Sequence, residues 1–502
     1  MATKNTMAMA VVLALTLSTA AGAATIVVNS LADPGAKGIC ALRDAITAAN
    51  TKTATNGCTA GTGKDTIRFS VTGTITLAST LPQITDSRLT INGPTSPGIT
   101  IDGGSKGLGT GVQVMQVASG ATLELRNLTI AHGFAEPKGG GIFNQGTLLV
   151  VNSTFSNNTA FQGSSPGLFS CQGGAIYNNG TLTVTDSSFT GNATQENTPD
   201  SSLGGAISNA GTLRVVKSTF SDNRAFGGVS STGNGGGIYN NGTLTVTKST
   251  FSDNDAPGNG GGISNSGVLT VRDSIFSGNF TGIFGGGGIS NDGTLTVTNS
   301  TFSDNTSGMG GGISNDVALV VTNCTFSGNN GGAIVNGDFA SLKNTILASS
   351  SGGRGNCSGT IIDTGYNISD DNSCKFSATS SRNNTNPMLD PKGLQHNGGP
   401  TETIALDSES PAIDAIPFTD CTDQALQRII TDQRGALRPD AGELRCDIGA
   451  FEFQDFAGRP NCYGMSVSAL ARRFDGLERA AWVLGFLNVR ALLKAIQISC
   501  GG

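Results

Sequence analysis

The sequence is poor in aromatic and charged residues. Only 6% of its 502 residues are aromatic and 13% are charged, and it contains 2 histidines and 1 tryptophan. The low charge argues against a disordered chain, which needs charge to resist collapse. The formal net charge of −6 and the lack of a Lys- or Arg-rich stripe argue against a nucleic-acid partner.

With so few histidines, the chain has little scope for chemistry based on imidazole. His132 follows the first Ile of an apolar column in the repeat described below, where we expect a loop or a corner, and His396 lies in a predicted C-terminal capping motif. Neither has the partner spacing of a catalytic triad or a zinc site. We therefore predict no catalytic residue, no cofactor and no dedicated metal site. Bound calcium stays open, because carboxylates on neighbouring coils are possible ligands.

Long apolar runs are also missing after residue 24. Before that point, Lys4 precedes an apolar segment over 7–17, and small residues follow at 21–23. These three features predict a signal peptide over residues 1–23 and no transmembrane segment in the mature chain. We therefore expect a secreted or cell-surface protein in which disulfides are permitted.

The 10 cysteines fall mostly into local pairs near the two ends of the chain. Spacing alone does not fix connectivity. We expect four disulfides: Cys40–Cys58, Cys357–Cys374, Cys421–Cys446 and Cys462–Cys500. Cys324 stands in a column otherwise filled by Ser, directly before a Phe, and is expected to be a small buried residue. Cys171 has no predicted partner or place.

Glycine is abundant, with 73 residues, and it belongs to a repeat. The unit GGAIYNNGTLTVTDSSFTGN begins at Gly173, and near-copies begin at Gly204 and Gly235. The isoleucines of successive units are 34, 31, 31, 25, 26, 24 and 21 residues apart. All the variation in length falls between the F-x-x-N motif and the next GG. Insertions confined to one loop are typical of a solenoid.

Each unit alternates apolar and polar residues with period two, as Leu182 and Val184 do between threonines, which predicts a strand. Identical side chains of successive coils would then lie above one another about 4.8 Å apart. One Phe column and two Asn columns repeat in this way. The Phe column is Phe155, Phe189, Phe220, Phe251, Phe276, Phe302 and Phe326. We predict an all-β fold, a parallel β-helix, with the right-handed sense usual for parallel crossovers.

The ends of the chain differ from the repeat. CALRDAITAAN, from Cys40, has helical spacing and predicts an N-terminal helical cap within residues 24–62, before coils over 63–350. Residues 351–455 are expected to form final coils and a cap. Apolar spacing over 456–502, interrupted by glycines, predicts a small disulfide-stapled α-helical module. That module either stabilises the end of the rod or serves as a retention or docking unit.

Three motifs resemble known families. CALRDAITAAN is similar to the "CSLREA" motif of exported bacterial β-helix proteins, from which Ala41 and Asp44 depart. The segments from Gly393 to Ala415 and from Thr431 to Glu452 resemble the "choice-of-anchor Q" domain. The GGAI and FSDN repeats resemble those of chlamydial polymorphic outer-membrane proteins. Together these resemblances imply an exported, surface-associated β-helix, and the last of them implies adhesion.

A charged column follows the TLTVT strand. Successive coils place Asp186 beside Lys217 and Lys248 beside Asp273, with Arg214 and Arg272 on the same face. The column has two interpretations. It forms exposed ion pairs, which contribute roughly 0–1 kcal/mol each, or it is a patch that binds sugars.

Charged residues of the second capping segment look like a catalytic cluster. They are Asp432, Arg434, Arg438, Asp447 and Glu452. We expect them instead to tie down the last coil through charge-assisted hydrogen bonds.

Three long loops between F-x-x-N and the next GG should cluster on one edge of the rod: Phe161–Gln172, Gln195–Leu203 and Ala225–Asn234. Loops on a rigid scaffold commonly carry binding residues. The sequence therefore favours a non-catalytic protein that binds an extracellular glycan or a cell-surface partner. The alternative is a lyase or glycoside hydrolase for an acidic polysaccharide. Ice binding by the outward threonines is a third, weaker hypothesis, and the oligomeric state is not predicted.

Overall fold

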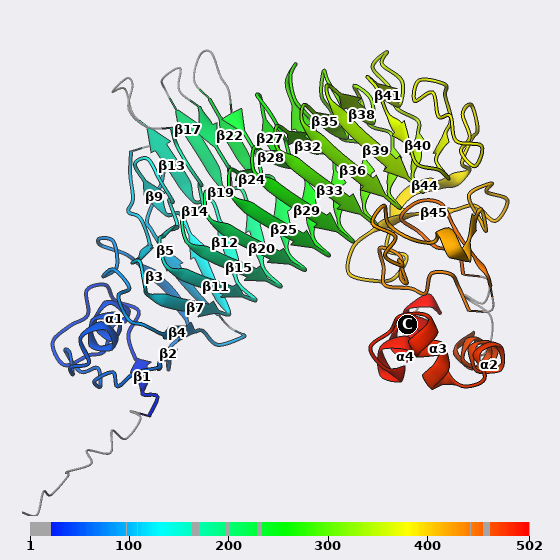
Figure 1. The fold of residues 1–502 in the computed structure, drawn as a ribbon. Coiled ribbons are helices and arrows are strands. Elements are labelled where there is room, and N and C mark those ends of the chain that lie inside the picture. Colours follow the sequence, from blue (N-terminus) through cyan, green and yellow to red (C-terminus); the bar gives the residue numbers. More distant parts are fainter. Residues whose placement is uncertain are drawn as a thin grey trace, which may run out of the picture.

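The computed structural model describes residues 22–96, 98–107, 109–162, 170–196, 201–227, 233–441, 443–454 and 462–500. Four parallel sheets of 13, 12, 10 and 6 strands run along a rod (Figure 1). The predicted parallel β-helix is therefore confirmed. Residues 1–21 of the predicted signal peptide lie outside the described residues.

One coil contributes a strand to each sheet. Residues 176–196 form β14 (Ile176–Asn178), β15 (Thr181–Thr185), β16 (Ser188–Thr190) and β17 (Ala193–Glu196), in the 10-, 13-, 12- and 6-stranded sheets respectively. The next coil begins at β19 (Ile207–Asn209), which pairs with β14 in the register Ile176 to Ile207. The repeat in the sequence is thus one full coil of the helix.

The 13-stranded sheet carries most of the surface discussed below. It runs from β1 (Thr25–Val28) to β42 (Ile362–Asp363). After β15 its strands are β20 (Thr212–Val216), β25 (Thr243–Thr247), β29 (Val268–Arg272), β33 (Thr294–Thr298), β36 (Ala318–Thr322) and β39 (Phe339–Lys343). The 12-stranded sheet runs from β3 (Gly73–Thr76) to β43 (Ile368–Ser369), and the 10-stranded sheet from β6 (Met115–Val117) to β41 (Cys357–Ser358). The 6-stranded sheet runs from β9 (Phe134–Ala135) to β31 (Phe280–Thr281).

The Phe column fills the interior as predicted. Its rings, from Phe155 to Phe326, are fully buried and stack with centroids 4.7–4.9 Å apart. This spacing equals the distance between neighbouring strands, because each ring belongs to one coil. Leu182 and Val184 point into the same core.

The two Asn columns are hydrogen-bonded ladders. In the first, Asn178 Nδ2 donates to Asn209 Oδ1 at 2.7 Å and to the carbonyl of Gly180 at 3.2 Å. In the second, Asn192 Nδ2 donates to Asn223 Oδ1 at 3.0 Å and to the carbonyl of Phe155 at 2.9 Å. Each buried amide thus bonds its neighbour and a backbone carbonyl, at a corner in the first ladder and in a strand of the 12-stranded sheet in the second.

The N-terminal end of the core is closed by α1 (Leu42–Thr51). Ala45, Ile46 and Ala49 of this helix are fully buried in the same core as the coils. Arg43 of the helix bonds Asp33 and the carbonyl of Thr80, which fixes the helix on the first coils. The predicted helical cap is confirmed.

The C-terminal part folds back beside the rod (Figure 1). It contains two antiparallel pairs, β44 (Leu389–Gln395) with β45 (Thr403–Leu406) and β46 (Ile416–Pro417) with β47 (Arg445–Cys446), and the 3₁₀ helix η1 (Phe418–Asp420). Three helices follow: α2 (Cys462–Phe474), α3 (Leu477–Val483) and α4 (Val489–Ser499). Breaks at the expected glycines, Gly476 and Gly485, separate these helices. All four expected disulfides are present.

The stacked core predicts the effect of removing one ring. Phe220→Ala should lower the free energy of unfolding by about 3–5 kcal/mol, because it leaves a cavity between Phe189 and Phe251. Urea denaturation of the full chain measures the change. Thr245→Ala, on the outer face of β25, is the control and should cost about 0.5 kcal/mol or less. Equal midpoints for the two variants would contradict this account of the core.

Candidate functional site

The charged column lies at the corner between the 13- and 12-stranded sheets. Its residues have left-handed backbone, with φ of 48° at Asp186, 48° at Lys217, 54° at Lys248 and 51° at Asp273. Asn and Asp tolerate this conformation, whereas a Lys pays roughly 1–2 kcal/mol for it. The lysines therefore occupy a position at which the backbone itself favours another residue.

Backbone hydrogen bonds confirm that these corners belong to consecutive coils. The amide of Asp186 donates to Val216 O at 3.1 Å, that of Lys217 to Thr247 O at 3.0 Å, and that of Lys248 to Arg272 O at 3.0 Å. Each corner is thus held by the strand end of the next coil. The side chains project outward from a fixed frame.

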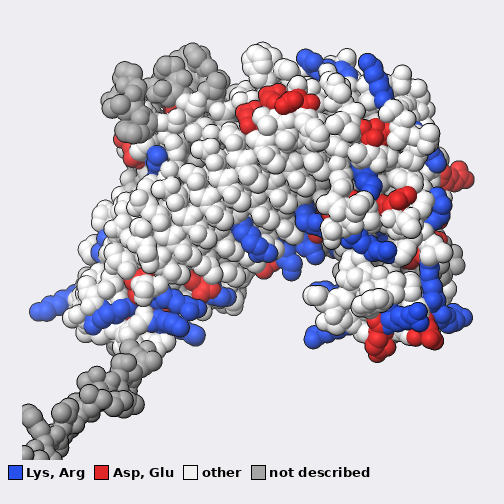
Figure 2. Space-filling model, in the orientation of Figure 1, with Lys and Arg blue, Asp and Glu red and all other residues white. Residues whose placement is uncertain are grey.

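Two arginines join the lysines on the same face. Arg214 is the middle residue of β20, opposite Thr183 and Thr245, and Arg272 ends β29, opposite Thr247. We call Arg214, Lys217, Lys248 and Arg272 the basic cluster. Lys248 is partly buried and the other three side chains are exposed. Figure 2 shows Lys and Arg gathered on the side of the rod that faces the C-terminal helices.

A shallow hollow of about 410 Å³ adjoins the basic cluster. It lies at the corner and contains both Asp186 and Lys217. Its other lining residues are Asn152, Ser153, Thr154, Ser187, Ser188 and Thr219. Hydroxyl, amide and charged groups therefore surround the hollow, as hydrogen bonding to a polar ligand requires.

Within the described part of the chain, no salt bridge joins the acidic and basic members of the column. The structure places Asp186 next to Lys217, and Lys248 next to Asp273, without pairing them. The expected exposed ion pairs are thus not formed. The cations of the cluster remain available to a ligand.

Asp273 is the exception to this open surface. Burial raises the pKa of its carboxyl to about 6, against the opposing effect of Arg272 and Lys248. Asn299 Nδ2 donates to its Oδ1 at 3.3 Å, and Thr401 Oγ1 donates to its carbonyl at 3.3 Å. Asp273 is therefore partly covered by the C-terminal segment and marks the edge of the open face.

Beyond Asp273 the C-terminal segment covers the corner. Asn299 Nδ2 donates to Thr431 O at 2.8 Å, and Thr301 Oγ1 donates to Gln433 at 2.6 Å. Farther along, Lys343 Nζ donates to Thr422 at 2.7 Å. We call the covering residues Thr401, Thr422, Thr431 and Gln433 the wall. The sequence analysis did not predict that the C-terminal segment would cover this corner. The available signal was the change of the column from charged residues to Asn at 299, 323 and 344.

The predicted structural role of the charged capping cluster is confirmed. Asp432 bonds the guanidinium of Arg434 at 2.7 Å, and Arg438 forms an ion pair with Glu452 at 3.1 Å and donates to the carbonyls of residues 447 and 449. Asp432 Oδ1 also accepts from the backbone amides of residues 434, 435 and 436. Asp447 accepts from the backbone amides of residues 414 and 453. These buried groups hold the folded-back segment together.

The two histidines have structural partners. His132 lies at a corner with φ of 49°, and its Nδ1 is 3.0 Å from Asp102 Oδ2. His396 Nε2 is 3.3 Å from Glu402 Oε1. Each histidine thus contacts one carboxylate, and of the loop or corner expected at His132 the structure shows a corner.

The free cysteines are buried. Cys324 Sγ donates to Thr322 O at 3.3 Å, as the equivalent Ser187 hydroxyl donates to Thr185 O at 2.8 Å. Burial raises the pKa of the Cys324 thiol to about 12, and burial also raises the pKa of the Cys171 thiol. The Ser column therefore explains Cys324, as predicted. Cys171 Sγ contacts Gln195 O at 3.2 Å.

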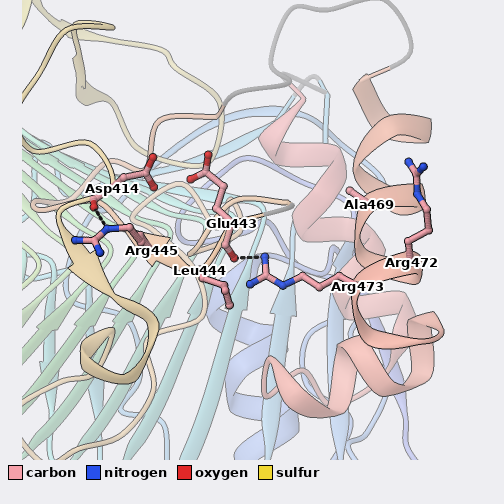
Figure 3. Close-up of a pocket in the computed structure, with 7 residues that line it drawn as sticks. All are labelled: Asp414, Glu443, Leu444, Arg445, Ala469, Arg472 and Arg473. Carbon is pink, nitrogen blue, oxygen red and sulfur yellow. Dashed lines mark hydrogen bonds between the residues drawn. The ribbon is translucent and has the colours of Figure 1, made fainter.

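A larger groove of about 730 Å³ lies between the C-terminal segment and α2 (Figure 3). Its Arg473 donates to the carbonyl of Glu443, and Arg445 donates to the carbonyl of Asp414. Both guanidinium groups thus join neighbouring parts of the fold. This groove lies in the C-terminal part, away from the corner column.

The three predicted long loops lie only partly within the described residues. Residues 163–169, 197–200 and 228–232 of the three long loops lie outside the described residues. Among the residues described, no group of His, Cys, Asp or Glu has the arrangement of a metal site. None of the helices in this part of the chain has the length and apolar character needed to cross a membrane.

Part of the repeat matches a known family model. The Chlamydia polymorphic membrane protein repeat matches residues 152–179, 217–241 and 248–266, well under half of the chain. No curated protein matches the chain significantly. The repeats and the four disulfides indicate an exported protein.

The buried carboxyls predict how the C-terminal segment responds to pH. Burial raises the pKa of Asp447 to about 7 and that of Glu452 well above its usual value. The folded state therefore holds protons that the unfolded state loses near pH 4, so stability should fall as pH rises from 4 toward 8. Hydrogen exchange of backbone amides in residues 412–453, corrected for intrinsic rates, measures this fall.

Asp447→Asn should flatten that dependence, leaving the contribution of Glu452. Asp186→Asn, at the exposed corner, is the matched control and should keep the wild-type slope. An Asp447→Asn slope equal to that of wild type would contradict the assignment.

Proposed function

We propose that the chain is a non-catalytic β-helix protein of the cell surface or the secreted fraction, and that it binds acidic glycans through the basic cluster. The observation that supports this most directly is the gathering of four cations on three consecutive coils beside a polar hollow. Within the described residues no salt bridge includes a member of the cluster, although Asp273 lies close enough to Arg272 and Lys248 to interact electrostatically with them.

The face around the cluster suits a sugar acid or sulfate ester. Arg214 and Arg272 offer planar guanidinium forks, which match carboxylate and sulfate oxygens. Thr183, Thr245 and Thr270 occupy one outward column of β15, β25 and β29, with Arg214 between the first two, and their hydroxyls donate and accept hydrogen bonds. A polyanion rich in hydroxyl groups fits both features.

The location of the protein is part of the proposal. Residues 1–23 would act as a signal peptide, and the motifs similar to CSLREA and choice-of-anchor Q would belong to a surface protein. The three long loops would add contacts on another edge of the rod. Support comes from the match to the Chlamydia polymorphic membrane protein repeat and from the disulfides.

Geometry makes hydrolysis at this site less favourable than binding. Asp186 and Asp273 are the carboxylates of the open corner, and they are three coils apart, or about 14 Å at the strand spacing. Glycoside hydrolases place their two carboxyl groups roughly 5–9.5 Å apart. Ice binding is also disfavoured, because Arg214 and Arg272 interrupt the Thr array.

Removing two cations tests the site. Lys217→Ala/Lys248→Ala should weaken binding to a sulfated or uronic-acid polysaccharide by tenfold or more, because roughly 1 kcal/mol is lost per desolvated ion pair. Binding to an immobilised polysaccharide at low salt measures this. Lys375→Ala/Lys392→Ala is matched in charge, and Lys375 shares the left-handed backbone, with φ of 51°. An equal loss of affinity in the two double variants would show that only the net charge of the protein matters, and would contradict a site at the basic cluster.

The enzyme hypothesis has a separate test. Incubation of the full chain with acidic and neutral polysaccharides, with and without calcium, should produce no new chain ends. Reducing-end and unsaturated-uronate assays detect hydrolase and lyase products respectively. New ends that disappear in a Lys217→Ala/Lys248→Ala variant would overturn the non-catalytic proposal.

A further inference from the structure

Two large apolar side chains stand exposed at the junction of α3 and α4. Trp482 is 80% exposed and Leu487 is 97% exposed. The core of the helical module is complete without them, since Leu470, Leu484, Leu492 and other residues fill it. These two side chains therefore contribute little to the fold of the module.

Three cations lie within seven residues of Trp482 or Leu487, and Glu478, four residues before Trp482, adds one carboxylate to the same face of α3. Arg479 lies three residues before Trp482 and so shares its face of α3. Arg490 and Lys494 are exposed on α4, and Arg490 follows Leu487 by three residues. In the described part of the chain no salt bridge occupies any of these three cations.

The charge of the module is opposite to that of the whole protein. Residues 462–500 carry five basic and two acidic side chains, a net charge of +3, whereas the chain as a whole carries −6. An apolar tip within a local positive field favours a partner that is anionic and has an apolar layer beneath its charges. A bilayer of anionic lipids meets both conditions.

We propose that the α3–α4 junction docks peripherally on an anionic lipid surface. The indole of Trp482 and the side chain of Leu487 enter the interfacial zone, where tryptophan is favoured. Arg479, Arg490 and Lys494 lie against the lipid phosphates. This contact is independent of the glycan site, because the basic cluster lies on the coils.

Trp482 is the single tryptophan of the chain and reports its own environment. Vesicles of phosphatidylcholine with about a third phosphatidylglycerol should shift its fluorescence to the blue and sediment the full chain at low salt. Vesicles of pure phosphatidylcholine should do neither. No shift and no sedimentation with the anionic vesicles would overturn the proposal. A shift on raising protein concentration without lipid would also overturn it, in favour of a second copy as the occupant.

Variants separate the two parts of the contact. Leu487→Ala and Arg479→Ala/Arg490→Ala should each lower the vesicle partition coefficient by about five- to tenfold. Both replace exposed residues, so the module should stay folded, and circular dichroism confirms this. Lys375→Ala/Lys392→Ala is the charge control and Lys217→Ala/Lys248→Ala the glycan-site control. Vesicle binding that survives the tip variants but fails in the Lys217→Ala/Lys248→Ala variant would assign it to the basic cluster and overturn the proposal.

Discussion

The rod depends on the two ladders in which buried asparagine amides are bonded from coil to coil. A coil without its Asn would leave a neighbouring amide and a corner carbonyl unpaired, at about 1–3 kcal/mol for each buried polar group. Asn144, Asn178 and Asn209 show the solution, since each Nδ2 reaches the next Oδ1 at 2.6–2.7 Å. The ladder therefore fixes the length of the chain between corners. Variation in length is left to the loops on one edge.

The same frame decides where charged residues are tolerated. Inward positions are closed to them by the Phe stack and the ladders. The corner after the 13-stranded sheet is different, because its side chains face outward while its backbone stays left-handed in every coil from Asn127 to Asn344. Asn adopts this left-handed backbone at a lower conformational energy than Lys does. The presence of Lys217 and Lys248 instead, at a cost in backbone energy, is what a functional surface on a rigid scaffold would show.

The repeating part of the structure could be predicted because each residue packs against the equivalent residue of the next coil. Columns in the sequence predict the stacking of Phe220 and the ladder at Asn209. They also predict that the Cys324 thiol takes the place of a serine hydroxyl and donates to the same backbone carbonyl position. The wall at the corner could not be predicted in this way. Its contacts, such as Thr301 with Gln433, join a repeating position to a segment 132 residues away that does not repeat. The sequence columns therefore predict Asp273 on the open face, whereas the C-terminal segment partly covers it.

The wall also limits the path that a polyanion bound to the basic cluster is able to follow. A polyanion that followed the corner toward the C-terminal end would meet Thr401 and Thr431 directly after Asp273. The hollow on the other side contains Asp186 as well as Lys217, so sugar hydroxyl groups would face the carboxylate and anionic groups would face the ammonium group. The open path instead crosses the corner, from the Thr face around Arg214 into the hollow beside Lys217. A bound chain would therefore be confined to the three coils that carry the basic cluster, and these coils set the number of anionic groups that it engages.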